Sequence, residues 1–161
     1  MDSKPGEGAT FRVYLPATTR EMPPLPDPLE QKLDGSETIL VIDDEEKIVE
    51  IAEKILKLNG YTVLKARHGE EGVTIARNFE GEIHLIILDM RMPVLSGPEA
   101  FPKLMEARPD ARIILCSGYA LDSESQAMLD AGAVAYIKKP FRLNTLLSEV
   151  KRALQLNHEN T

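Results

Sequence analysis

A chain of 161 residues with 43% hydrophobic side chains is long enough for one ordinary domain and an additional segment, and it can form a hydrophobic core. Its formal net charge of −7 argues against nucleic acid as the default partner, because nucleic acids attract basic proteins. No apolar run approaches the roughly 20 residues that span a bilayer, and a single cysteine, Cys116, fits a reducing compartment, so we expect a cytoplasmic chain without membrane contact.

The first 37 residues differ from the rest of the chain. Apolar and polar side chains alternate through residues 10–15, which predicts a half-buried strand. Five prolines follow within residues 16–28, so we interpret residues 17–37 as an extended and fairly stiff linker. A single amphipathic strand is not stable alone, and we therefore expect residues 1–16 either to be a disordered leader or to pair with strands outside this chain.

From residue 38 onward, short apolar runs alternate with stretches of helical periodicity. The apolar runs predict strands at residues 38–42, 61–65, 83–88, 111–116 and 134–138. The periodic stretches predict helices at residues 45–58, 70–79, from about 98, at 122–131 and at 143–154. This alternation predicts an α/β fold with a doubly wound, five-stranded parallel sheet, helices on both faces and right-handed crossovers.

Two residues are unusual for the helices in which they lie. Gly72 weakens the second predicted helix by about 1 kcal/mol relative to alanine. Pro102 lacks the N–H that would bond to the carbonyl of residue 98, so we expect the third helix to be kinked or to start late.

Polar side chains stand at the carboxyl ends of four predicted strands. The first strand ends in Asp43 and Asp44, the third in Asp89, the fourth in Ser117 and the fifth in Lys139. Ligands of parallel sheets bind beyond this edge, so we expect these side chains to converge. Each has a simpler interpretation when taken alone: the acids begin a helix, the serine belongs to a turn, and the lysine is solvated.

The chemistry of these groups favours a phosphate-accepting site. Three close carboxylates repel one another unless a cation is present, and their oxygens suit Mg²⁺. A carboxylate can act as a nucleophile and become an aspartyl phosphate. Phosphoryl transfer also needs positive charge and hydrogen-bond donors around the phosphoryl oxygens, which Lys139 and Ser117 would supply.

Residues 38–157 resemble the receiver domains of response regulators. The motifs that carry the resemblance follow one another in the family's usual order. They are Ile42-Asp43-Asp44-Glu45, Leu88-Asp89-Met90-Arg91-Met92-Pro93 with Gly97, Cys116-Ser117-Gly118, and Tyr136-Ile137-Lys138-Lys139-Pro140-Phe141. The resemblance implies a flavodoxin-like sheet with the strand order 2-1-3-4-5.

The resemblance also implies a role for each site residue. It makes Asp89 the phosphoacceptor and Lys139 the amine that contacts the phosphate, with a cis bond before Pro140. It makes Asp44, Asp89 and the main-chain carbonyl of Arg91 the Mg²⁺ ligands, and Asp43 the acid that orients the metal through water. It makes Ser117 the switch hydroxyl and Tyr136 the switch aromatic. Arg91 and Tyr119 occupy the two positions that tune dephosphorylation in the family. Both are bulky, so we expect them to shield the phosphoryl group from water.

A second resemblance concerns the start of the chain. Residues 3–16, which contain Gly6-Glu7-Gly8-Ala9-Thr10-Phe11, look like the last strand of a histidine-kinase ATP-binding domain, although Ala9 departs from the usual threonine. This implies that residues 1–16 are a fragment of such a domain and that the chain is the C-terminal part of a hybrid histidine kinase.

The expected function is that of a phosphorelay receiver. A phosphohistidine, on a histidine kinase or on a histidine-phosphotransfer protein, would pass its phosphoryl group to Asp89 with Mg²⁺, and a partner-binding surface would then change. One alternative is a phosphatase that forms an aspartyl phosphate, but such enzymes usually carry a second aspartate where this chain has Arg91. The other is an interaction module that is never phosphorylated, which would be expected to lack Asp89 or Lys139.

Overall fold

The computed structural model divides the chain into two compact units, residues 1–31 and 32–161. The residues that the structure describes are 2–4, 8–10 and 35–155. In the first unit, β1 (Asp2–Lys4) pairs antiparallel with β2 (Gly8–Thr10), a pairing that the sequence did not predict. Apart from Thr10, the predicted strand at residues 10–15 lies outside the described residues, as does most of the predicted linker.

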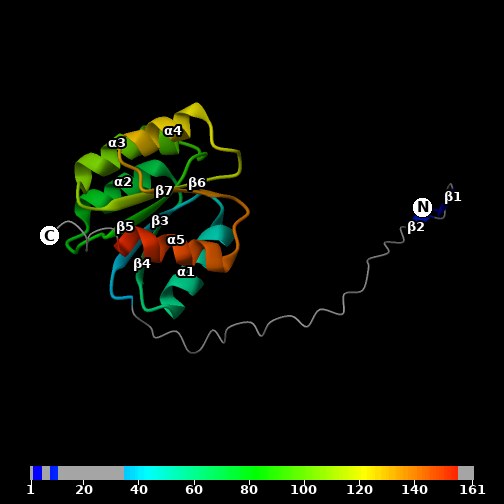
Figure 1. Ribbon diagram of the computed structural model, residues 1–161, viewed down its shortest axis with the longest axis horizontal. Helices are drawn as coiled ribbons and strands as arrows, with labels where there is room; N and C mark the ends of the chain where they lie inside the picture. The colour runs from blue at the N-terminus through cyan, green and yellow to red at the C-terminus, as the bar shows by residue number, and fades with distance from the viewer. Residues whose placement is uncertain (1, 5–7, 11–34, 156–161) are drawn as a thin grey trace. The chain divides into compact units, whose positions relative to one another are not determined.

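The second unit is a parallel sheet with helices on both faces (Figure 1). Its strands are β3 (Thr38–Ile42), β4 (Thr62–Ala66), β5 (Leu85–Asp89), β6 (Arg112–Ser117) and β7 (Ala135–Lys138). They lie in the order β4-β3-β5-β6-β7, which confirms the order 2-1-3-4-5 within this unit. The chain reverses its direction of winding between β3 and β5, so the switch point lies where these two strands end.

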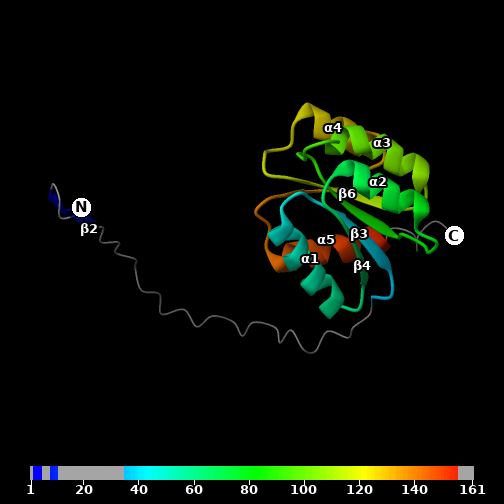
Figure 2. The ribbon, with the colours of Figure 1, turned by 180° about the vertical axis from the view of Figure 1, so that it is seen from behind.

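Five helices cover the sheet. They are α1 (Glu46–Leu58), α2 (Gly69–Asn78), α3 (Gly97–Ala107), α4 (Ser123–Asp130) and α5 (Leu143–Gln155). Helices α1 and α5 cover one face, and α2, α3 and α4 cover the other, as both views show (Figures 1 and 2). None of the helices in the described part of the chain has the length and apolar character needed to span a bilayer.

Helix α3 begins where a capped helix should. The carboxylate of Glu99 accepts hydrogen bonds from the amide and the hydroxyl of Ser96 at 3.0 and 2.6 Å, and Pro98 lies in the first turn. Pro102 lies inside the helix, so of the two expected outcomes the late start is wrong, while the kink stays a prediction. The well-formed first turn explains the difference, because a proline at this depth removes only one hydrogen bond from a helix that has already begun.

Strand β5 lies in the centre of the sheet and is buried along its whole length. Its side chains alternate between the two cores: Ile86 and Leu88 pack with α2, α3 and α4, whereas Leu85 and Ile87 pack with α1 and α5. This explains the continuous apolar run, since a strand covered on both faces needs no polar alternation. The run ends at Asp89, which is 3% exposed.

Gly72 allows α2 to approach β3 closely. A Cβ atom at this position would lie 2.4 Å from Cδ1 and 3.0 Å from Cγ1 of Ile42, whose side chain is fully buried. The glycine therefore costs helix propensity but removes an overlap with the strand that carries Asp43 at its end.

The variant Gly72→Ala should be less stable than the wild type by about 1 kcal/mol or more, because the overlap with Ile42 outweighs the gain in helix propensity. Ile42→Val removes the nearest atom, so the double variant should be more stable than the two single effects predict. Urea unfolding of the four proteins measures this coupling. A Gly72→Ala protein that is more stable by about 1 kcal/mol, the gain expected from propensity alone, would contradict the packing described here.

Candidate functional site

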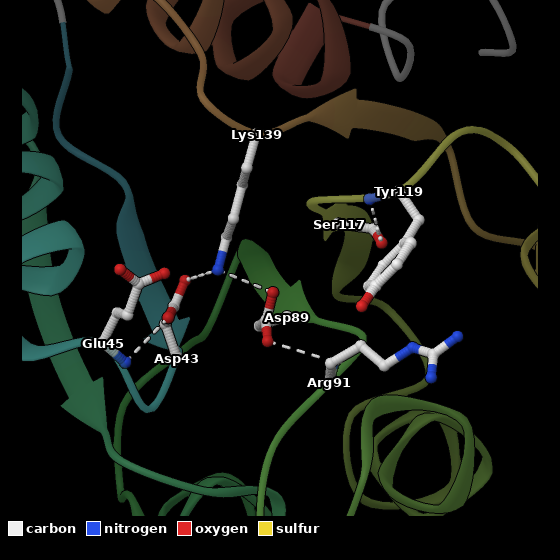
Figure 3. Close-up of polar contacts among 7 residues, drawn as sticks. All are labelled: Asp43, Glu45, Asp89, Arg91, Ser117, Tyr119 and Lys139. Carbon is white, nitrogen blue, oxygen red and sulfur yellow. Dashed lines mark hydrogen bonds and ion pairs between the residues drawn. The ribbon is translucent and has the colours of Figure 1, made fainter.

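The carboxyl ends of four neighbouring strands bring the predicted residues to one edge of the sheet. In the register of the sheet, Asp89 lies beside Cys116, and Ser117 lies beside Lys138. The side chains of Asp43, Asp89 and Lys139 point toward one another at this edge (Figure 3). The peptide bond between Lys139 and Pro140 is cis, as the resemblance implied.

The Lys139 ammonium lies between two carboxylates. Its Nζ atom is 2.5 Å from Oδ2 of Asp43 and 2.7 Å from Oδ1 of Asp89. The three side chains are nearly buried, with exposed fractions of 10% for the lysine and 5% and 4% for the two acids. The two acids are 46 positions apart in the sequence, so this ion-pair triad joins distant parts of the chain.

Main-chain amides hold the other carboxylate oxygens. The amide of Glu45 donates to Oδ1 of Asp43 at 3.0 Å, and the amide of Arg91 donates to Oδ2 of Asp89 at 3.0 Å. Each acid thus accepts one bond from Lys139 and one from the amide two residues later in the chain (Figure 3). Asp43 and Asp89 are therefore held in defined orientations before any ligand arrives.

Burial and charge act in opposite directions on the pKa values of this triad. Burial raises the pKa of Asp43 and of Asp89 above the usual value, and this outweighs the opposite effect of Lys139. The charge of Asp44 raises the pKa of Asp89 further. Burial alone would lower the pKa of Lys139, but its hydrogen bonds and ion pairs with the two acids raise it overall, so the lysine stays charged.

Asp44 adds a third carboxylate at the same place. One oxygen each from Asp43, Asp44 and Asp89 lie within 4.8 Å of one another, and Asp44 is exposed while the other two are buried. Among the ion pairs of the described residues, Lys139 is the cation paired with Asp43 and Asp89, so one ammonium stands against three carboxylates. Oxygen ligands with excess negative charge suit a hard cation such as Mg²⁺, so the residues present fit a divalent metal site.

The site opens into a cleft of about 510 Å³. The residues that line it are Asp44, Glu45, Ile48, Asp89, Arg91, Gly118, Tyr119, Lys139 and Pro140. Asp89 and Lys139 therefore reach a space large enough for a phosphoryl group. Ile48 was not singled out from the sequence, because nothing in the periodicity of its helix distinguishes a residue beside the cleft from one in the core.

Ser117 and Tyr136 are linked through Tyr119. The Ser117 hydroxyl oxygen, on a residue only 4% exposed, accepts a hydrogen bond from the Tyr119 amide at 3.2 Å. The Tyr136 hydroxyl donates to the Tyr119 carbonyl oxygen at 2.7 Å. The two predicted switch residues thus both bond to the main chain of Tyr119.

Comparison with known proteins assigns the second unit to one family. Residues 39–151 match the family model of the response regulator receiver domain. The chain belongs to this family. It is therefore a receiver domain of the kind used in two-component signalling, with an additional segment at the start of the chain.

Relatives of this receiver domain occur in longer signalling proteins and as single domains. The chain is 31% identical over 163 residues to the sensor kinase CckA of Brucella abortus (strain 2308), in an alignment that covers 96% of this chain but only 17% of that kinase. It superposes with a TM-score of 0.69 on a CheY-like receiver domain protein from Methanospirillum hungatei JF-1, at 34% identity over 73% of this chain and 93% of that chain. The receiver domain of the hybrid histidine kinase CckA gives a TM-score of 0.62, at 33% identity over 73% and 99% of the two chains.

One contact in the receiver domain joins two residues that the sequence marked separately. The guanidinium carbon of Arg91 lies 4.8 Å from the centre of the Tyr119 ring, within cation–π distance. The two residues come from the loops that follow β5 and β6. Only the register of these two strands, Asp89 beside Cys116, brings the loops together, and no local sequence signal specifies the pair.

The variant Asp89→Asn should differ from the wild type in how stability depends on pH. The pKa of Asp89 is raised in the folded state, so as the pH rises above the usual value of 3.8 this carboxyl group loses its proton more readily in the unfolded chain than in the folded one. The loss of the proton therefore favours unfolding of the wild type, whereas the variant has no carboxyl group at this position and lacks the effect. Without divalent cations, the urea midpoint of the variant should therefore exceed that of the wild type at neutral pH, and the difference should shrink toward pH 3. A difference that is constant with pH would show that Asp89 has the same pKa in both states.

Proposed function

We propose that this receiver domain takes a phosphoryl group from a phosphohistidine onto Asp89. In this proposal Asp44, Asp89 and the main-chain carbonyl of Arg91 hold Mg²⁺, and Asp43 orients the ion through water. The observation that carries the proposal is the Lys139 ammonium held between Asp43 and Asp89 beside an open cleft.

Asp89 is suited to act as the nucleophile. Its hydrogen bonds to Lys139 and to the Arg91 amide fix the carboxylate, and the residue lines the cleft. A carboxylate oxygen attacks phosphorus, the bond from phosphorus to the histidine nitrogen breaks, and the imidazole keeps the electron pair of that bond. When bound, Mg²⁺ would neutralise part of the negative charge of the carboxylates and of the phosphoryl oxygens.

Lys139 supplies the protein's own positive charge to this reaction. The phosphoryl group brings additional negative charge to a site that is already acidic, and Lys139 is the cation that touches the nucleophile. A lysine is suited to this task because its ammonium is a compact charge with three donors. The ammonium can keep its contact with Asp43 while it turns one donor to a phosphoryl oxygen.

The surroundings of the cleft support a protein as the donor. Ile48 and Pro140 line the cleft, while Ile51 on α1 and Leu143 at the start of α5 are 49% and 51% exposed. Helices α1 and α5 pack against each other, and Ile51 follows Ile48 by about one turn of α1. A histidine-bearing helix of a kinase or a phosphotransfer protein could bury this apolar rim as it presents the phosphohistidine.

We also propose that the receiver domain belongs to a hybrid histidine kinase. The alignment with the sensor kinase CckA covers 96% of this chain, whereas the receiver match covers residues 39–151, so the similarity to that kinase extends into the residues before β3. Under this proposal residues 1–16 end the kinase ATP-binding domain, and residues 17–37 link it to the receiver at residues 38–157. The antiparallel pairing of β1 with β2 is compatible with the edge of such a domain.

Incubation with Mg²⁺ and phosphoramidate should place one acid-labile phosphoryl group on Asp89, as measured by intact-protein and peptide mass spectrometry. Asp89→Asn should abolish the adduct, because the amide is not a nucleophile. Asp110→Asn changes an exposed aspartate in the turn before β6, at the amino end of the sheet, and serves as the matched control that should keep it. Sustained hydrolysis of phosphomonoesters would indicate a phosphatase instead, and the absence of any adduct would indicate a binding module.

The phosphorylated form should last longer than minutes after the donor is removed, because Arg91 and Tyr119 line the cleft and limit the approach of water to Asp89. Arg91→Ala should shorten this lifetime several-fold. The decay of the adduct, followed by mass spectrometry after rapid desalting, measures both proteins. A wild-type half-life of seconds would contradict the shielding.

A further inference from the structure

Tyr119 is held at three points by three different parts of the domain. Its amide donates to the hydroxyl oxygen of Ser117 at 3.2 Å, and its carbonyl oxygen accepts from the hydroxyl of Tyr136 at 2.7 Å. Its ring, although the residue is 62% exposed, lies 4.8 Å from the guanidinium carbon of Arg91 (Figure 3). The first two contacts involve the predicted switch residues, whereas the third comes from the loop of the phosphoacceptor.

The Arg91 side chain originates next to Asp89. The Arg91 amide donates to Oδ2 of Asp89 at 3.0 Å, and both residues line the same cleft as Tyr119. A guanidinium is the side-chain group best matched to phosphate oxygens, which it can bind with two parallel hydrogen bonds. The guanidinium of Arg91 lies against the ring of Tyr119, and a turn of its side chain about the Cα atom next to Asp89 would bring it toward a phosphoryl group on that residue.

We propose that Arg91 is a positioning residue that exchanges these two partners. This inference depends on the proposed phosphorylation of Asp89. In the unmodified domain the guanidinium stacks on Tyr119 and holds the loop after β6 against the loop after β5. In the phosphorylated domain it binds the phosphoryl oxygens and releases the Tyr119 ring.

Charge explains why a phosphoryl group is needed to draw the Arg91 side chain away from the loop after β6. The pKa of Asp122 lies below its usual value, mainly because the amide and hydroxyl of Ser125 donate to it and, to a smaller extent, because Arg91 is near. The guanidinium of Arg91 thus lies against an aromatic ring on the loop after β6 and also feels the charge of a carboxylate on that loop. A phosphoryl group carries about −1.5 to −2 charges and three acceptor oxygens, which is more than Asp122 offers.

The release of Tyr119 would change an exposed surface. Residues 118–122 are all exposed, and Leu121 within this segment is 49% exposed. The segment leads directly into α4, whose first turn is capped by Asp122. Freeing the ring would loosen an apolar loop at the start of α4, which gives a partner a surface that differs between the two states.

The exchange predicts effects of opposite sign for the two residues of the pair. Tyr119→Leu frees Arg91, so a phosphoryl mimic should bind about two- to fivefold more tightly, the equivalent of one exposed cation–π contact. Arg91→Met removes the guanidinium itself, so the mimic should bind about tenfold more weakly or worse. In the Arg91→Met background, Tyr119→Leu should have no effect. Tyr119→Phe keeps the ring and should stay within about twofold of the wild type.

The test is a titration of the full chain with beryllofluoride in the presence of Mg²⁺, followed by the amide shifts of residues 118–122 in nuclear magnetic resonance spectra. Opposite signs for Tyr119→Leu and Arg91→Met, with no further effect in the double variant, support the exchange. Effects of the same sign, or a Tyr119→Leu effect that persists without Arg91, would overturn it while leaving the proposed function intact. A wild type that binds no beryllofluoride would overturn the proposed function and this inference together.

Discussion

The ion pairs of Lys139 with Asp43 and Asp89 are the interaction on which the site depends. Two carboxylates at the ends of buried strands are costly, because burial disfavours their charged forms. One ammonium at 2.5 and 2.7 Å offsets part of that cost and fixes the distance between the strand ends. The remaining negative charge, which Asp44 increases, explains why the site is suited to a cation. It also suits a reaction that replaces the charged carboxylate of Asp89 with a charged phosphoryl group.

The sheet converts this local pairing into a cleft. Strand β5 is covered on both faces, so its interior positions are apolar and the charged Asp89 lies at the end of the strand. Gly72 then lets α2 lie close to β3, which carries Asp43 at its end. The loops after β5 and β6 form the other wall of the cleft, where Arg91 and Tyr119 meet. Packing beneath the site thus determines which side chains can reach a phosphoryl group.

Most of this arrangement could be predicted from the sequence, because four of the five parallel strands are short, mainly apolar runs that lead into a polar residue. The fold class and the strand order are confirmed, and Asp43, Asp44, Asp89 and Lys139 do lie together, although their chemical roles stay predictions. The contacts that the sequence did not specify join segments without a shared period or motif. The stack of Arg91 on Tyr119 depends on strand register, and the pairing of β1 with β2 depends on three-residue strands too short to leave a pattern.

The most direct measurement is the rate of phosphorylation by a small phosphodonor in the wild type, Lys139→Arg and Lys139→Met at one saturating Mg²⁺ concentration. Circular dichroism would establish that each protein is folded. If Lys139 supplies the charge that the phosphoryl group requires, Lys139→Met should react about a hundredfold more slowly than the wild type or worse, and Lys139→Arg should fall between them. Equal rates in the wild type and Lys139→Met would contradict the role of this ion-pair triad in phosphoryl transfer.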